Sequence, residues 1–134
     1  MNKYDLIVLG GGSGGLAAAQ RAAEYGARVV VIEPARLGGT CVNVGCVPKK
    51  VMWNAAQLSH GLDDAADYGF QVSRHGHDWS VLKQKRDAYV KRLNNIYESN
   101  LNKKSIELIR SRGKFVASKV IETEDGDKLH ELHI

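Results

Sequence analysis

Two cysteines, Cys41 and Cys46, are the residues of this 134-residue chain whose type and spacing point most directly to chemistry. The chain has no others, and two are too few for the disulfide framework of a small secreted protein. In a reducing compartment, a close pair of this kind is more often catalytic or metal-binding than structural. We therefore expect an intracellular protein in which the pair is reactive.

The five-residue spacing of the two thiols does not suit a regular helix. An α-helix would turn the side chains about 140° apart and separate the Cα atoms by about 8.6 Å, whereas a disulfide needs less than about 7 Å. The segment must therefore depart from ideal helix, and Gly45 and Pro48 favour such a break. If Pro48 marks the first turn of a helix, the N-terminus of that helix favours the thiolate form of Cys46.

Two other interpretations of the pair stay open from its spacing alone. One is a zinc site, which normally takes four Cys or His ligands and would need a second ligand pair. The chain has no second cysteine pair, so we expect no metal site. The other interpretation is a pair of inert, buried thiols.

A glycine motif near the N-terminus has a different chemical meaning. Gly10, Gly12 and Gly15 fit the pattern Gly-x-Gly-x-x-Gly between a strand-like and a helix-like run. In a dinucleotide-binding loop, such glycines permit a tight turn, the close approach of a pyrophosphate, and close packing of helix against strand. The helix N-terminus offers free N–H groups to the phosphates. Glu33, eighteen residues after Gly15, is placed to bind a ribose diol.

These two motifs require an N-terminal βαβ unit to position them. The strand-like run 4–9, apolar throughout from residue 6 to residue 9, predicts a buried parallel strand. Residues 16–19 open a helix that Gly26 closes, and residues 28–33 predict a second buried strand.

Two further helices and three further strands are expected after the cysteines. Pro48 suits the start of one helix, and a longer helix is expected to begin near Asp78 or Ser80. Their apolar stripes consist of Val51, Ala55 and Leu58 in the first helix, and of Leu82, Tyr89, Leu93 and Ile96 in the second. Residues 106–109 predict a third buried strand, and two β-like runs around residues 124–127 predict a hairpin.

Composition bounds the class of protein. The chain is 43% hydrophobic and 25% charged, which is ordinary for one soluble domain. Its 19 basic and 15 acidic residues are too evenly balanced to indicate nucleic acid, and no apolar run approaches the ~20 residues that span a bilayer. We expect a cytoplasmic protein without nucleic-acid or membrane partners. The chain ends on apolar residues within a strand-like run, so we expect a truncation at Ile134.

Residues 38–50 resemble the signature of the pyridine nucleotide-disulfide oxidoreductases that carry an FAD-linked active-site disulfide. Within that family, Lys49 and Lys50 followed by residues 51–54 are similar to glutathione reductases, whereas lipoamide dehydrogenases and mercuric reductases usually carry Ser-Lys. Further similarity covers residues 67–70, 85–89 and 92–97, so the resemblance extends over nearly the whole chain.

The resemblance implies an α/β fold and an organisation into domains. Residues 1–134 would form the N-terminal part of a Rossmann-like FAD-binding domain that includes the redox-active disulfide. That domain would have a central parallel sheet, inserted helices and a β-hairpin or meander, and it would be incomplete at its C-terminus. The NADPH-binding and dimerisation domains would be absent.

Roles for individual residues also follow from the resemblance. Cys46 would face the flavin and Cys41 would attack the substrate. One lysine after Pro48 would lie beside flavin N5, and since successive helical residues point about 100° apart, we choose Lys49 over Lys50. The other residues implied to bind FAD are Gly10, Gly12, Ser13, Gly14, Gly15, Glu33, Thr40, Cys41 and Gly113. Ser13 and Tyr97 would contact glutathione disulfide, although Tyr97 also suits the core side of its own helix.

The implied activity is the NADPH-dependent reduction of glutathione disulfide to glutathione, through FAD and the Cys41–Cys46 disulfide, in a cytoplasmic homodimer. An acid/base histidine would come from the missing C-terminal domain. The five histidines of this chain do not match it and are expected at the surface: His60, His75, His77, His130 and His133. Gln20 stands where some members carry an arginine near the substrate. The piece alone is expected to be inactive; the alternatives are a sister trypanothione or mercuric reductase, or an FAD-binding redox module without turnover.

Overall fold

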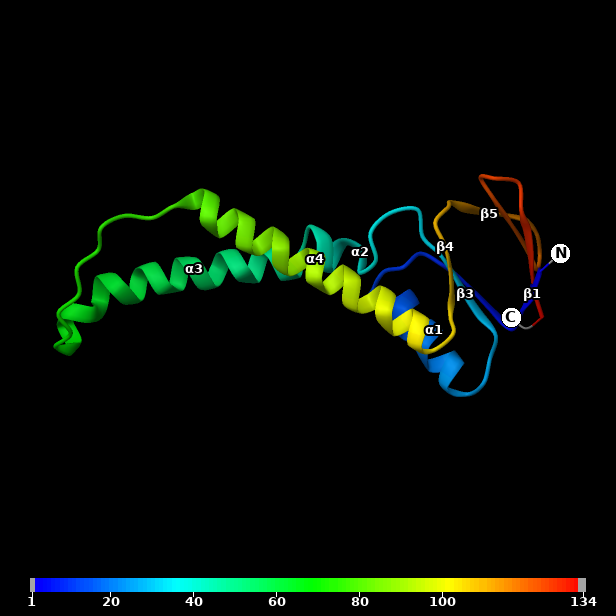
Figure 1. Cartoon of the computed structure of the whole chain (residues 1–134), viewed down its shortest axis with the longest axis horizontal. Coiled ribbons are helices and arrows are strands. Elements are labelled where there is room, and N and C mark those ends of the chain that lie inside the picture. Colours follow the sequence, from blue (N-terminus) through cyan, green and yellow to red (C-terminus); the bar gives the residue numbers. More distant parts are fainter. Residues whose placement is uncertain (1, 133–134) are drawn as a thin grey trace.

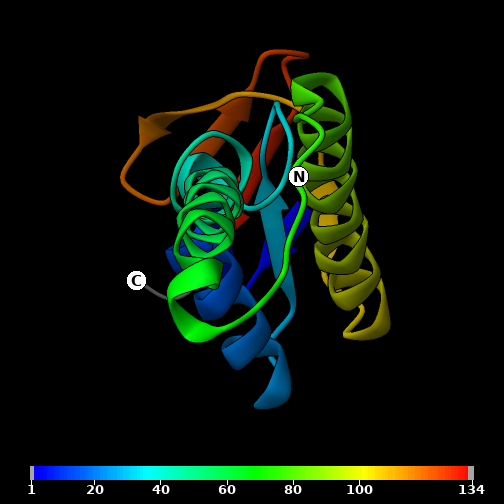
Figure 2. The same ribbon diagram turned by 90° about the vertical axis from the view of Figure 1, so that its left-hand side faces the viewer.

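The computed structural model describes residues 2–132, which form an α/β body from which two long helices project (Figures 1 and 2). The expected truncation at Ile134 and the residue His133 lie outside this range. The strands are β1 Asn2–Tyr4, β2 Leu6–Leu9, β3 Val29–Ile32, β4 Glu107–Ile109, β5 Gly113–Ala117, β6 Val120–Thr123 and β7 Lys128–Glu131. The helices are α1 Ser13–Glu24, α2 Gly39–Asn43, α3 Cys46–Asp64 and α4 Trp79–Lys103, with a 3₁₀ turn at Ala65–Tyr68.

A three-stranded parallel sheet in the order β2-β3-β4 carries the expected βαβ unit. Leu6 pairs with Val29 and Val31 pairs with Leu108, so β3 is the central strand. All four residues of β3 are buried, which explains its unbroken apolar sequence. Helix α1 packs Leu16 and Ala19 against this sheet. The parallel sheet, its crossover helix and the third strand are therefore confirmed.

The run 4–9 is not one strand, contrary to the sequence-based expectation. Tyr4 belongs to β1, which pairs in parallel with β7 of the second sheet, and β2 begins only at Leu6. Between them, the carboxylate of Asp5 accepts a hydrogen bond from the backbone N–H of Arg28 at 2.8 Å. This side-chain acceptor competes with regular strand pairing at Asp5, so the chain passes from one sheet to the other there.

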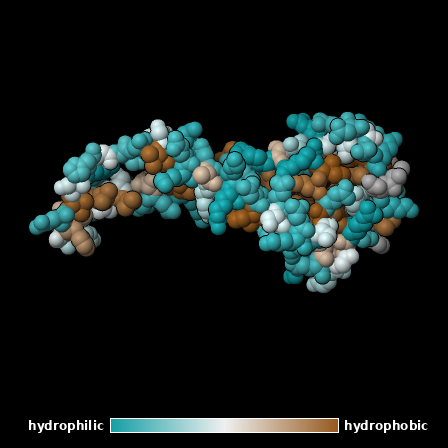
Figure 3. Space-filling view, viewed as in Figure 1, coloured by the Kyte–Doolittle hydropathy of each residue, from teal (hydrophilic) through white to brown (hydrophobic). Residues whose placement is uncertain are grey.

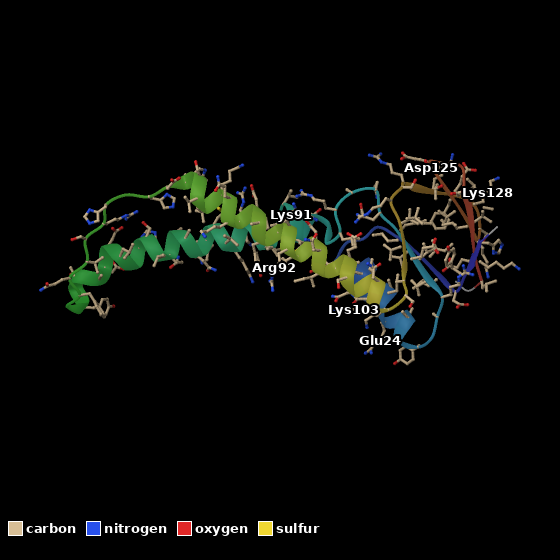
Figure 4. The ribbon with its side chains drawn as sticks, in the orientation of Figure 1. Glu24, Lys91, Arg92, Lys103, Asp125 and Lys128 are labelled. Carbon is tan, nitrogen blue, oxygen red and sulfur yellow. The ribbon has the colours of Figure 1, made fainter. Side chains whose placement is uncertain are left out.

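The second sheet is four-stranded and mixed, in the order β1-β7-β6-β5. Strands β6 and β7 form the expected hairpin, whose turn contains Gly126 at φ +86°. Figure 4 shows Asp125 and Lys128 at this hairpin. A further antiparallel connection joins β5 to β6, which makes a meander of three strands. The two sheets share a core cluster of Tyr4, Val30, Ile32, Ile121 and Leu129.

The helical pair begins as expected but buries different residues. Asp78 caps α4 by accepting hydrogen bonds from the N–H groups of Ser80 and Val81. Val90 and Leu101 are the buried residues of α4, whereas Tyr89 and Ile96 of the expected stripe are 44% and 37% exposed.

Helix α3 buries no residue, because the pair projects beyond the α/β body and much of its surface has no neighbour (Figure 1). Leu58 of its expected stripe is 65% exposed. Apolar side chains are accordingly visible on the projecting part as well as on the body (Figure 3). No helix among residues 2–132 is long and apolar enough to cross a membrane.

Two ion pairs fasten the C-terminal end of α4 to the body. The Lys104 ammonium group pairs with the Glu24 carboxylate at the end of α1, and Figure 4 shows Glu24 beside this end of α4. Arg110 pairs with Glu98 at 3.1 Å and donates to the carbonyl oxygen of Ala35 at 2.6 Å. Helix α4 is thus held against both α1 and the segment that follows β3.

Gly15 is the tightest contact between α1 and the sheet, and its replacement tests that packing. A Cβ atom at Gly15 would lie 2.1 Å from the carbonyl oxygen of Gly10 and 2.9 Å from a methyl group of Val8. We expect Gly15→Ala to destabilise the chain by about 1–3 kcal/mol, the usual effect of overpacking, in urea unfolding followed by circular dichroism. Gly14→Ala is the matched control, because its Cβ would meet nothing within 4 Å. Equal unfolding midpoints for the two variants would contradict this account.

Candidate functional site

The two cysteines lie at a break between two helices. Helix α2 ends at Asn43, Gly45 adopts φ −123° and ψ −116°, and Cys46 is the first residue of α3. A Cβ atom on Gly45 would lie 2.9 Å from the carbonyl oxygen of Thr40 and 3.2 Å from the Cα atom of Cys41. Glycine therefore lets the start of α3 approach Cys41. The departure from regular helix and the helix start near Pro48 are both confirmed.

The thiols are unbonded and interact with each other. Cys41 is half-buried and Cys46 is exposed. The hydrogen bond between them raises the pKa of Cys41 and lowers the pKa of Cys46. A backbone hydrogen bond at the start of α3 and the positive charges of Lys49 and Lys50 lower the Cys46 pKa further. In the reduced pair, Cys46 therefore carries the negative charge and Cys41 keeps its proton.

The glycine motif lies directly against the segment that carries Cys41. Gly12 forms a parallel bridge with Gly38, whose N–H donates to the carbonyl oxygen of Gly11 at 2.8 Å. Gly39 adopts φ +64°, and a Cβ atom on it would lie 2.8 Å from the Cα atom of Gly12. Sequence reasoning assigned no separate role to Gly38 and Gly39. The available signal was two adjacent glycines immediately before the cysteine helix.

Glu33 lies at the carboxyl end of β3, where the sequence placed it. Its carboxylate accepts hydrogen bonds from the N–H groups of Gly11 and Ala35, both at 2.8 Å. These contacts hold the glycine loop, and a carboxylate has acceptor sites left for a further ligand. Glu33 and Thr40 line one hollow of about 200 Å³ together with Ala35, Arg36, Gly39, Asn43 and Val44. The fold thus brings these two predicted residues together.

The start of α1 fits the pyrophosphate of a dinucleotide. Gly10 makes the turn at φ +100°, and no side chain caps the first N–H groups of α1. Ser13 and Gly14 are exposed, and a Cβ atom on Gly12 would meet only the Cα atom of Gly39, at 3.8 Å. Backbone N–H groups at a helix N-terminus bind phosphate oxygens. The residues present therefore leave space for an anion and supply donors to it.

Gly113 and Tyr97 lie apart from this cluster. Gly113 begins β5 and lines a separate hollow with Lys114 and Glu122. A Cβ atom there would lie 2.8 Å from a methyl group of Leu9, so packing alone already favours glycine at this position. Tyr97 packs against the core cluster of the parallel sheet, which agrees with its alternative structural role. The ligand roles of both residues stay predictions.

The remaining polar candidates also have definite places. Lys49 and Lys50 are both exposed. The Gln20 side chain donates to the carbonyl oxygen of Leu16 in its own helix, at 3.2 Å. Within residues 2–132, no group of three or more His, Cys, Asp or Glu side chains could hold a metal ion.

The histidines are at the surface with one exception. His60, His75 and His77 are exposed. The expectation is wrong for His130, which is half-buried on β7. Its Nδ1 atom is buried and lacks a hydrogen-bond partner among the described residues. The mixed sheet covers this ring because parallel pairing with β1 places His130 opposite Lys3 in an inner strand.

Known proteins resemble the chain over most of its length. The model of a family described as pyridine nucleotide-disulphide oxidoreductase matches residues 4–132. The chain is 58% identical over 110 residues to a glutathione reductase of Yarrowia lipolytica, a match that covers 79% of the chain and 23% of that relative. It is 51% identical over 126 residues to a glutathione reductase of Schizosaccharomyces pombe, covering 92% and 27%. The chain spans about a quarter of the length of these curated relatives.

The direction of the two thiol pKa values can be tested by alkylation. In the reduced chain, we expect iodoacetamide to modify Cys46 before Cys41 at pH values below the ordinary thiol pKa, because only thiolates react. Cys41→Ala should move the Cys46 alkylation profile to higher pH, since it removes the hydrogen bond that lowers the Cys46 pKa most. Cys41→Ser retains a hydroxyl donor and should move it less. Peptide mass spectrometry measures each site, and an unshifted profile in Cys41→Ala would refute the assignment.

Proposed function

The chain belongs to the pyridine nucleotide-disulphide oxidoreductase family, and we propose that it is the N-terminal part of a glutathione reductase that reduces glutathione disulfide with NADPH. The observation that carries this proposal is a cysteine pair with oppositely shifted pKa values, seated on a glycine loop that can accept a dinucleotide. Its similarity to the glutathione reductases of two yeasts supports this choice of substrate.

FAD is the proposed resident cofactor. Gly10, Gly12, Gly14, Gly15 and Ser13 would hold its pyrophosphate at the start of α1. Glu33 would bind its ribose, Thr40 and Lys49 would lie beside it near Cys46, and Gly113 would lie at its adenine end. FAD, when bound, carries two electrons from NADPH to the disulfide between Cys41 and Cys46. NADPH itself would bind to a domain outside this chain.

The charge distribution in the reduced pair assigns a different task to each cysteine. Cys41 gives up its proton, and its sulfur attacks one sulfur of glutathione disulfide. The substrate S–S bond breaks, a mixed disulfide forms on Cys41, and one glutathione leaves and takes up a proton. The Cys46 thiolate then attacks the Cys41 sulfur, which closes the Cys41–Cys46 disulfide and releases the second glutathione.

Neighbouring residues support these steps. The exposed side of Cys46 would face the cofactor, and the Lys49 ammonium would stabilise negative charge there. Ser13 and Tyr97 would contact glutathione disulfide. The histidine that protonates the departing thiol would come from another part of the full-length protein, which we propose to be a cytoplasmic homodimer.

Replacing Cys41 tests the proposed activity. In the full-length protein, Cys41→Ser should abolish the oxidation of NADPH by glutathione disulfide, because the attacking sulfur is lost, while the FAD absorbance of the purified protein stays unchanged. Steady-state rates with trypanothione disulfide and Hg²⁺ serve as controls for the sister activities. Retained reduction of glutathione disulfide by the variant would refute the proposal, and so would a faster wild-type rate with either control substrate.

Replacing Gly12 separates cofactor binding from folding. The backbone at Gly12 has φ −80° and ψ −176°, which alanine adopts freely, and the added Cβ would make only an ordinary contact with Gly39. Gly12→Ala should therefore leave the unfolding midpoint of the cofactor-free protein unchanged but weaken FAD binding by at least about tenfold, since the pyrophosphate must approach this backbone closely. Flavin fluorescence titration measures the affinity. Wild-type affinity in this variant would place the pyrophosphate elsewhere.

A further inference from the structure

A pair of asparagine side chains connects the long helix α4 to the helix that carries Cys41. Asn43 is the last residue of α2, two positions after Cys41, and Asn94 lies in the middle of α4. Both are half-buried, although their neighbours Val44 and Asn95 are exposed. The activity proposed above assigns no role to either amide.

Both amides converge on one fixed carbonyl group. The Nδ2 atom of Asn43 donates to the carbonyl oxygens of Leu37 at 3.1 Å and of Gly39 at 2.9 Å. The Nδ2 atom of Asn94 donates to the same Leu37 carbonyl at 2.7 Å and to Oδ1 of Asn43 at 2.9 Å. The Leu37 side chain is only 1% exposed and belongs to the core cluster of the parallel sheet. Its carbonyl group is therefore a fixed reference point for the start of α2.

These hydrogen bonds constrain a helix that is too short to orient itself. Helix α2 has only five residues, and isolated helices of this length are unstable in water. Its N-terminal side rests on Gly12, while its C-terminal residue Asn43 is held by Asn94. The ion pairs described above hold α4 itself to α1 and to the end of β4. Two opposite ends of α2 are thus fixed, with Cys41 between them.

We propose that Asn94 is a positioning residue for the redox pair: acting through Asn43, it holds α2 so that the Cys41 sulfur stays within bonding reach of Cys46. This inference rests on the proposed disulfide chemistry but does not depend on which disulfide is the substrate. Its consequence is a high effective concentration of Cys41 at Cys46, which favours closure of the disulfide.

The test compares two asparagines that are adjacent on α4. In the full-length protein, the fraction of oxidised Cys41–Cys46 is measured across glutathione redox buffers, by acid quenching, alkylation after denaturation and mass spectrometry. Asn94→Ala should shift the equilibrium towards the dithiol by about fivefold to tenfold, the worth of one to two buried amide hydrogen bonds. Asn95→Ala is the matched control, because Asn95 is exposed and has no side-chain hydrogen bond among the described residues. It should match wild type.

A double variant tests whether Asn94 acts through Asn43. Asn43→Ala alone should also favour the dithiol, and adding Asn94→Ala should shift the equilibrium by clearly less than the sum of the two separate effects, as coupled residues do. If Asn94→Ala does not fold, Asn94→Ser, which retains a small polar side chain, replaces it in both comparisons.

Each outcome has a separate meaning for the two proposals. Equal redox equilibria for Asn94→Ala and Asn95→Ala would overturn the positioning role, even if Asn94→Ala unfolds at a lower temperature. Fully additive effects of the two single replacements would overturn the action through Asn43. A wild-type protein that does not oxidise NADPH with glutathione disulfide would instead refute the proposed function and leave the redox comparison interpretable.

Discussion

Two stretches of backbone meet at Gly12 and Gly38–Gly39, and the rest of the site depends on how closely they approach. Gly39 has no room for a Cβ atom against Gly12, and its positive φ is one that side-chain-bearing residues rarely adopt. The contact places the N-terminus of α1, which can accept phosphate, beside the helix that carries Cys41. A glycine motif and a cysteine pair, separated in the sequence by about 30 residues, thereby become neighbours.

A set of polar contacts from distant segments then fixes the orientation of each part. The Glu33 carboxylate holds the N–H of Gly11, and the Asn94 amide holds the carbonyl group of Leu37. Both donor–acceptor pairs are partly buried, so leaving one partner unsatisfied costs more than the bond contributes on average. The cysteine loop is consequently positioned by side chains that do no chemistry themselves, and its two thiols acquire opposite pKa shifts from a fixed geometry.

Local patterns predicted much of the fold correctly, and their errors have identifiable causes. The β3 strand, the Asp78 cap of α4 and the hairpin turn at residues 124–127 follow from apolar runs and turn residues that act within a few positions. The run 4–9 was predicted as one strand because its pattern is continuous, but β1 pairs with a strand over 120 residues away. The apolar stripe of α4 was misplaced for a related reason. Periodicity defines faces, but neighbours decide which face is buried.

The sequence by itself determined the chemistry that each segment can offer: a helix break at Gly45, a thiolate-favouring helix start at Cys46, and a glycine turn at Gly10. These are local properties, because steric limits on φ and ψ and the direction of helix N–H groups depend only on adjacent residues. Tertiary structure alone decided that Gly39 meets Gly12 and that Asn94 reaches Asn43. Such contacts join residues far apart along the chain, and packing, which no local pattern specifies, selects the partner.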